Sequence, residues 1–226
     1  MIQAAVSRPC LACDTDTKLT ASTARALAAA DVPGEPDRIR AVARYVGLTH
    51  ANPDDIDAEE LQAITGAGLA VWLVQHVLAT NGHGWTPSGQ LGRLHGGMAK
   101  QLAYAAGYPA GAHLALDLED VAPGTTSQMV IDHCDAWAEM VGPMFSPALY
   151  VGFSTGLTGE QLYELPGFRL YWSDYGNRYV YRRGCAVKQF RPNVDVAGIK
   201  VDLDRVGVDM LGGQLTWAEA AGTEAA

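Results

Sequence analysis

The chain has 226 residues, of which 48% are hydrophobic and 18% are charged. This composition suits one domain with a sizeable core and excludes a disordered chain. The formal net charge of −9 argues against a nucleic-acid-binding protein, because affinity for a phosphate backbone comes from clustered Lys and Arg. No uncharged apolar run reaches the ~18 residues of a membrane span, so we expect no membrane partner.

The first residues lack the basic and apolar segments of a signal peptide. We therefore expect a cytoplasmic protein, which something else must release or carry if it acts outside the cell. The four cysteines include the pair Cys10 and Cys13, but no second ligand pair has the spacing of a zinc site. His83 and His95 do not match a metal-ligand pattern either, so we expect no metal and no cofactor.

Apolar runs of strand length alternate with helix-like segments, which is the pattern of βαβ units around a parallel sheet. Eight strands are predicted, at residues 11–15, 39–46, 69–77, 113–118, 148–153, 169–173, 186–190 and 200–203. Helices are predicted from Thr20, from Asp57, and over residues 88–106, 126–141 and 159–163.

Eight strands in a chain of this length predict an α/β fold, a compact (β/α) TIM-like barrel in which some later helices are reduced to loops. A doubly wound open sheet is the alternative. We expect a single barrel domain over residues 1–210, followed by a C-terminal tail over residues 211–226.

Three of the predicted strands end in two acids spaced i, i+2. These pairs are Asp14 and Asp16, Asp117 and Glu119, and Asp202 and Asp204. Side chains at i and i+2 share one face of a strand, with Cα atoms ~6.6 Å apart. At the carboxyl ends of parallel barrel strands such side chains converge on one mouth, where barrel enzymes place their chemistry.

The catalytic candidates are Asp14, Asp117, Glu119 and Asp202. Like charges this close raise one another's pKa, so one carboxyl can stay protonated beside ionised ones. That combination is the equipment of glycoside hydrolysis. The remaining acids of these segments, Asp16, Asp120 and Asp204, are interpreted as helix caps, turn residues or solvated loop residues.

Other polar and aromatic residues near strand ends are candidates for substrate binding, because aromatic rings stack on sugars while amides and acids bind hydroxyls. They are Arg44, Tyr45, Tyr150, Trp172, Asp174 and Gln189. Packing in the barrel wall is the alternative for Tyr150 and Trp172.

Several motifs occur in this chain in the same order as in a known family. The motifs are Asp14 after the apolar stretch of the first strand, Asp117-Leu118-Glu119, Tyr171-Trp172-Ser173-Asp174-Tyr175-Gly176, Lys188-Gln189-Phe190, and Gly198-Ile199 with Val201-Asp202-Leu203. They resemble the family 25 (Chalaropsis-type) lysozymes, and more closely their relatives with a glycoside-hydrolase-like domain of unknown function. The resemblance spans residues 11 to 206.

The resemblance implies a role for each acid. Glu119 would be the general acid, and Asp117 would hold the N-acetyl group or stabilise the transition state. Asp14 and Asp202 would tune the pKa of Glu119 and orient the sugar. The implied activity is that of a muramidase, which cleaves the β-1,4 bond between N-acetylmuramic acid and N-acetylglucosamine in peptidoglycan, as in a phage lysin or in cell-wall remodelling.

Two other functions stay open. One is a catalytically weak or inert barrel that binds glycan or serves as a structural component, for example of a virion. The other is a barrel hydrolase that acts on a different N-acetylated glycan.

Overall fold

The computed structural model describes residues 1–76, 83–176, 184–209 and 211–221. Its strands are β1 Ile2–Ala5, β2 Cys10–Asp14, β3 Ala41–Val46, β4 Ala70–Gln75, β5 His113–Leu118, β6 Ser146–Val151, β7 Leu170–Ser173, β8 Cys185–Val196, β9 Ile199–Val206 and β10 Thr216–Glu219. Its helices are α1 Ala21–Ala29, α2 Ala58–Gly66, α3 Gly89–Ala105, α4 Ser127–Val141 and α5 Gly159–Glu164. The eight predicted strands and five predicted helices are confirmed, except that Val77, at the end of one predicted strand, lies outside the described residues.

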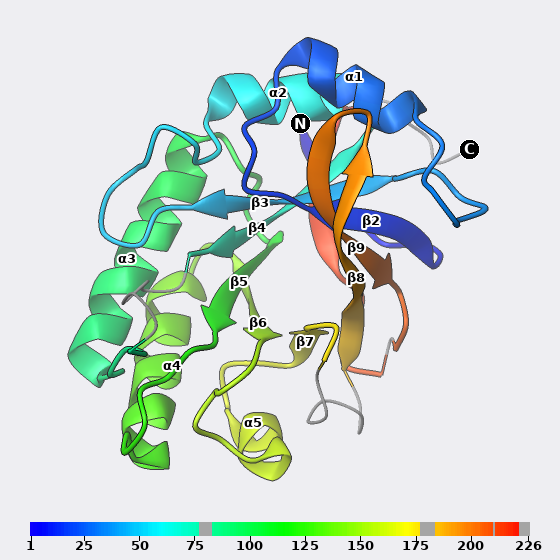
Figure 1. The fold of residues 1–226 in the computed structure, drawn as a ribbon. Helices are drawn as coiled ribbons and strands as arrows, with labels where there is room; N and C mark the ends of the chain where they lie inside the picture. The colour runs from blue at the N-terminus through cyan, green and yellow to red at the C-terminus, as the bar shows by residue number, and fades with distance from the viewer. Residues whose placement is uncertain (77–82, 177–183, 210, 222–226) are drawn as a thin grey trace.

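Strands β2 to β9 close into an eight-stranded barrel (Figure 1). Neighbouring strands pair from β2 through β9, and β9 pairs in turn with β2. One helix follows each of β2 to β6, whereas β8 and β9 are joined directly as a hairpin. The predicted TIM-like barrel with reduced later helices is therefore confirmed, and the open sheet is excluded.

Each helix begins where a short polar side chain accepts a hydrogen bond from a backbone N–H three residues further on. This cap satisfies a donor that the first turn leaves without a partner. The capping residues are Thr20, Asp57, Ser88, Thr126 and Thr158. The helix starts predicted at Thr20 and Asp57 thus fall at the caps themselves.

The direction of β9 differs from the prediction. The sequence pattern placed Asp202 and Asp204 at the carboxyl end of a parallel strand, but β9 runs antiparallel to both of its neighbours. Asp202 therefore reaches the mouth near the start of β9, directly beside Asp14 in the register, and Asp204 lies one layer deeper beside Ala12. The hairpin turn after β8 makes this reversal possible, because it returns the chain without a crossover helix.

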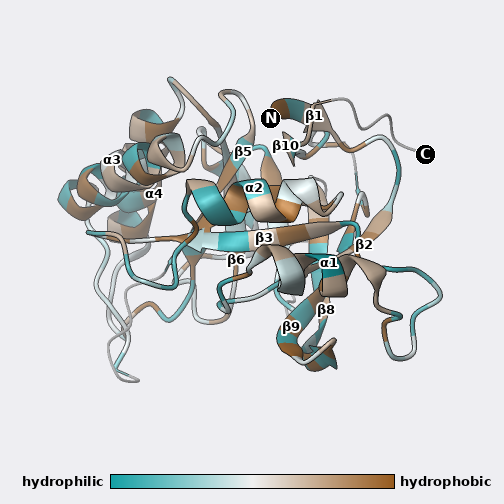
Figure 2. Ribbon diagram, turned by 90° about the horizontal axis from the view of Figure 1, so that it is seen from above, coloured by the Kyte–Doolittle hydropathy of each residue, from teal (hydrophilic) through white to brown (hydrophobic). Residues whose placement is uncertain are grey.

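The predicted C-terminal tail is wrong for residues 216–219, which form strand β10. This strand pairs antiparallel with β1 and with the start of β4 (Figure 2). Three buried side chains of this region, Val6, Leu215 and Trp217, pack with Trp72 against the apolar interior of the barrel. Strands β1 and β10 thus cover the end of the barrel away from the mouth, and the hydrophobic effect holds this segment in place.

In the described part of the chain, no helix combines the length and apolar character needed to cross a membrane.

Candidate active site

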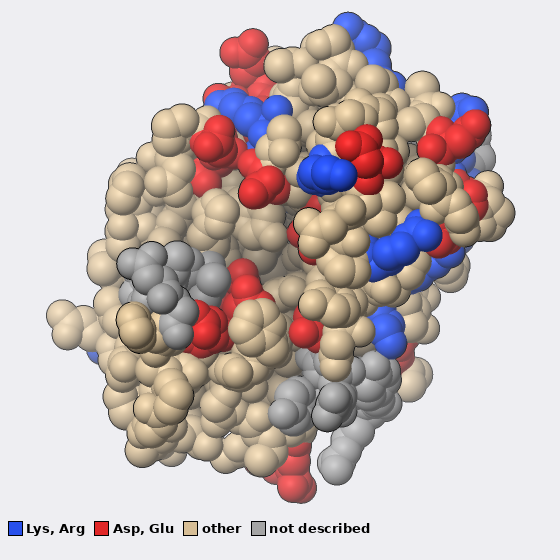
Figure 3. All heavy atoms as spheres, viewed as in Figure 1, with Lys and Arg blue, Asp and Glu red and all other residues tan. Residues whose placement is uncertain are grey.

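A cavity of about 210 Å³ opens at the carboxyl ends of the parallel strands, and acidic side chains surround a hollow in this face of the molecule (Figure 3). Nine of the ten predicted site residues line it, namely Asp14, Tyr45, Asp117, Glu119, Tyr150, Trp172, Asp174, Gln189 and Asp202. Residues from seven strands or strand ends thus meet at one place, as the pattern of acidic strand ends predicts.

Asp14 is held at the cavity floor by two side-chain donors. The Tyr45 hydroxyl donates to its Oδ1 over 3.2 Å, and Gln189 Nε2 donates to its Oδ2 over 2.8 Å. The same amide nitrogen lies 3.2 Å from an Asp202 carboxylate oxygen, and the Tyr150 hydroxyl lies 3.4 Å from Gln189 Oε1. Burial and the neighbouring Asp202 raise the pKa of Asp14 to about 7, although the two donors act in the opposite direction.

Glu119 follows the last residue of β5, and its side chain lies against the backbone of Gly152 after β6. A Cβ atom on Gly152 would stand 2.5 Å from Glu119 Cβ and closer still to Oε2. Burial, followed by the charges of Asp174 and Asp120, raises the pKa of Glu119 to about 7. This carboxyl can therefore carry a proton near neutral pH and release it, as a general acid must.

Asp117 lies two residues before Glu119 on the same face of β5 and is almost fully buried. Its Oδ1 has no hydrogen-bond partner among the described residues. Burial, Glu119 and Asp14 together raise its pKa well above the ordinary range. In the unliganded protein Asp117 is therefore held as a neutral acid with an unused oxygen.

The segment after β5 is fixed by Trp85, which no sequence motif singled out. The Trp85 indole Nε1 donates to the Glu119 carbonyl oxygen over 2.7 Å, and its backbone N–H donates to the carbonyl of Asp120 over 3.0 Å. Trp85 packs in turn against the rings of His95 and His133 between α3 and α4. The backbone position of Glu119 therefore depends on the helical layer.

The interpretation of Asp204 as a cap or solvated residue is wrong. Its side chain is fully buried inside the barrel, and Trp172 Nε1 donates to its Oδ1 over 2.8 Å. Burial and the neighbouring Asp14 raise the pKa of Asp204 well above the ordinary range. The alternation along β9 explains the position, because Asp204 shares a face with Asp202, which lines the cavity.

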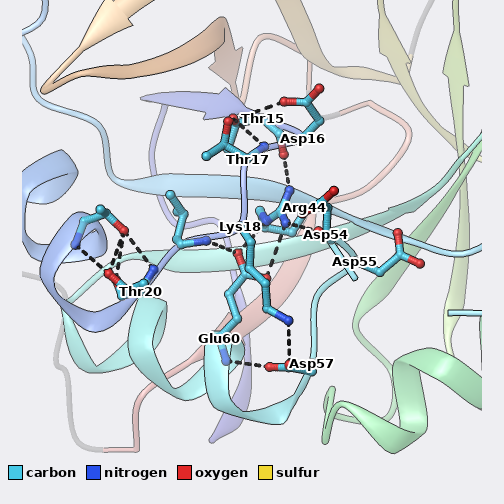
Figure 4. A network of polar contacts seen from close by, with 12 residues as sticks. Thr15, Asp16, Thr17, Lys18, Thr20, Arg44, Asp54, Asp55, Asp57 and Glu60 are labelled. Atoms are coloured by element: carbon cyan, nitrogen blue, oxygen red, sulfur yellow. Dashed lines mark hydrogen bonds and ion pairs between the residues drawn. The ribbon is translucent and has the colours of Figure 1, made fainter. Parts of the chain in front are cut away.

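The prediction that Arg44 lines the groove is also wrong. Arg44 lies on the outer face of β3, fully buried under α2, while its neighbour Tyr45 points into the barrel (Figure 4). Its guanidinium lies 2.7 Å from Glu60 Oε1 and also donates to the carbonyl oxygens of Thr15 and Asp54. Arg44 therefore anchors the loops after β2 and β3 to α2 and does not reach a ligand.

Two exposed aromatic residues at the rim were not predicted. Phe153 and Tyr175 line the cavity just beyond the ends of β6 and β7, and each is 60% exposed. Among the described residues, no group of three or more His, Cys, Asp and Glu side chains is arranged to hold a metal ion. The site is thus a carboxyl cluster with an aromatic rim, which suits acid–base chemistry on a sugar.

The closed barrel and its carboxyl cluster define a glycoside hydrolase-like fold related to lysozymes and endolysins. The chain belongs to the Rv2525c-like, glycoside hydrolase-like domain family, whose model matches residues 36–210. This confirms the family predicted from the motifs. No curated protein sequence matches the chain.

Three solved structures illustrate the relationship. An uncharacterized B. stearothermophilus protein superposes with a TM-score of 0.66 at 16% identity, over 90% of this chain and 99% of that one. The Mycobacterium tuberculosis Tat-secreted protein Rv2525c, in complex with L-tartrate, superposes with a TM-score of 0.64 at 16% identity, over 90% of this chain and 98% of that one. A bacterial lysozyme from Streptomyces coelicolor superposes with a TM-score of 0.56 at 9% identity, over 90% of this chain and 94% of the lysozyme. At these identities the likeness shows the fold alone.

Proposed function

We propose that this protein is a glycoside hydrolase that cleaves the β-1,4 bond between N-acetylmuramic acid and N-acetylglucosamine in peptidoglycan. The observation that carries the proposal is the Glu119 carboxyl, which lines the cavity and whose pKa is raised to about 7 by burial and by neighbouring acids. A carboxylic acid poised at this pKa is suited to protonate a glycosidic oxygen at neutral pH.

The other carboxyls have distinct roles in the proposed reaction. Glu119 gives its proton to the glycosidic oxygen as the bond to the anomeric carbon breaks, and the aglycone leaves as an alcohol. Asp14 faces the positive charge that develops on the sugar ring and stabilises it, and the neutral Asp117 hydrogen-bonds the N-acetyl group of the sugar. A water then adds to the anomeric carbon and returns a proton to the Glu119 carboxylate, which restores the resting state.

The shape and charge of the cavity support a neutral glycan as the substrate. Its volume of about 210 Å³ is below the ~300–1,000 Å³ of a typical ligand pocket, so we infer that it takes one sugar unit while the chain continues over Phe153 and Tyr175. No Lys or Arg lines it among the described residues, which disfavours a free carboxylate on the bound sugar. The muramic acid of peptide-substituted peptidoglycan meets this condition, because its lactyl carboxyl is an amide.

Relatives in fold support the substrate class. Besides the Streptomyces lysozyme, they include the CTP1L endolysin, with a TM-score of 0.53, and the Streptococcus pneumoniae autolysin LytC. The autolysin was also solved with a synthetic peptidoglycan ligand, and that structure has a TM-score of 0.58. Action at the cell wall after lysis, or from a virion, is part of the same proposal.

The test is release of reducing ends from purified peptidoglycan by the wild type, by Glu119→Gln and by Glu164→Gln. Glu164 is an exposed acid on α5 outside the cavity and serves as the matched control. We expect Glu119→Gln to lower the rate by roughly 10²–10⁴-fold with an unchanged melting temperature, and Glu164→Gln to behave as wild type.

No release by folded wild-type protein would overturn the proposal. Saturable binding to peptidoglycan in that case would favour the inert glycan-binding or structural barrel. Cleavage of chitin oligomers but not of peptidoglycan would favour the hydrolase of another N-acetylated glycan.

A further inference from the structure

Beneath the cavity floor, Asp204 is a carboxyl that the proposed reaction does not use. Its side chain is 0% exposed, and its Oδ1 accepts the Trp172 indole N–H over 2.8 Å. Its Oδ2 is buried and receives no hydrogen bond from a donor in the described part of the chain. Burying an ionised carboxylate oxygen without a hydrogen bond destabilises the folded state, and a proton on that oxygen removes most of this free-energy cost.

Among the described residues, none places a compensating positive charge beside Asp204. The charged groups that act on it are Asp14 on β2 and Asp202 on β9 itself, both carboxyls. Gln189 lies opposite on β8 and is neutral. The nearest basic residue of β9, Arg205, is bonded to Glu35 instead. An ionised Asp204 would therefore face only like charges in a site of low polarity.

Asp14 and Asp204 lie within hydrogen-bonding reach of each other. Two carboxyls can make such a bond only if one of them is protonated. Asp14 already accepts hydrogen bonds from Tyr45 and Gln189, and these favour its ionised form. Asp204 accepts one and is the more deeply buried of the two. The proton of the pair thus belongs on Asp204.

We propose that Asp204 keeps its proton throughout the neutral range and donates it in a hydrogen bond to Asp14, as a positioning residue that holds Asp14 ionised and oriented toward the cavity. The catalytic consequence rests on the glycosidase proposal: Asp14 supplies the negative charge while Glu119 keeps its own proton. The proton on Asp204 adds a third donor to those of Tyr45 and Gln189, so that Asp14 can be ionised while Glu119 is protonated.

Asp204→Asn separates this proposal from a simple packing role. The amide keeps an oxygen for the Trp172 donor and places an N–H where the carboxyl proton stood. In the infrared difference spectrum of wild type minus Asp204→Asn at neutral pH, we expect the carbonyl band of a protonated carboxylic acid. Asp16→Asn, at an exposed position near the mouth, should give no such band. Absence of the band for Asp204 would overturn the proposal.

The pH dependence of stability is a second readout. A carboxyl whose pKa is raised by folding stabilises the folded state fully below its ordinary pKa. This stabilisation is lost as the pH rises. The folding constant of wild type relative to Asp204→Asn should therefore fall by up to about tenfold per pH unit above about pH 4. A ratio that does not change between about pH 5 and about pH 8 would also overturn the proposal.

Activity provides the last readout. Asp204→Asn should keep wild-type turnover, because its amide still donates to Asp14. Asp204→Leu removes the donor, so the acid limb of the pH–rate profile should move to higher pH. At a fixed pH on that limb, activity should then fall about tenfold for each pH unit that the limb moves. Equal loss in both variants would contradict the positioning role. If no variant has activity, the glycosidase proposal fails, while the infrared and stability results still decide where the proton is.

Discussion

The substitution Gly152→Ala tests how closely Glu119 is positioned. Gly152 has no positive φ, so alanine fits its backbone and any effect comes from contact with Glu119. The new Cβ would stand 2.5 Å from Glu119 Cβ and 3.1 Å from its Cδ, against an ordinary separation of ~3.5–4.0 Å. The glutamate must therefore move by roughly 1 Å, and a displacement of this size costs about 10²-fold in turnover.

Reducing-end release and thermal unfolding of the same samples measure the two effects separately. We expect Gly152→Ala to lose about 10²-fold in kcat and about 1–3 kcal/mol of stability from overpacking. Because the displaced carboxyl gains water, the basic limb of its pH profile should also move to lower pH. Gly66→Ala is the matched control, since a Cβ there meets nothing within 4 Å. Wild-type kcat and pH profile in Gly152→Ala would refute the close packing of Glu119.

The remaining predictions concern stability and the rim. Burial lowers the pKa of His95 and His133 to about 4, so each contributes stability that is present above the ordinary pKa of 6.5 and is lost as pH falls toward 4. Unfolding titrations should show that His133→Asn loses less stability than wild type over that range. Arg44→Met leaves a buried carboxylate without its partner and should cost about 3–5 kcal/mol in denaturant unfolding, with KM unchanged. Phe153→Ala and Tyr175→Ala should each raise KM several-fold without a change in melting temperature, and an unchanged KM would remove them from the site.

Periodicity was enough to predict the barrel. Each of the strands β2 to β6 is an apolar run followed by a turn and a capped helix, and such signals are local. The two strands that were missed, β1 and β10, are four residues long and exist because they pair with each other and with β4. Their stability comes from contacts between the two ends of the chain, and a local pattern does not contain that information.

The position of residues at the cavity was predicted well where strand direction follows from the α/β alternation. Asp14, Asp117 and Glu119 lie at carboxyl ends of parallel strands, as the pattern requires. The prediction for Arg44 was wrong because a charged residue near a strand end was assumed to face the mouth. Alternation along β3 puts Arg44 on the opposite face from Tyr45, which lines the cavity. The partner that makes burial tolerable, Glu60, is sixteen residues away on α2, so the burial of Arg44 is not visible in the local sequence.

The reversal of β9 explains why the cluster holds more acids than catalysis needs. In a parallel strand, residues at i and i+2 near the carboxyl end would both approach the mouth. In the antiparallel β9 the first of the two acids, Asp202, lies at the mouth and the second, Asp204, lies beneath Asp14 inside the wall. Burial at that depth raises the pKa of Asp204 and favours its neutral form, and a neutral carboxyl there is a hydrogen-bond donor directed at the ionised one above it. The same sequence motif therefore supplies a ligand-facing acid in one position and a buried proton in the other, and the direction of the strand decides which is which.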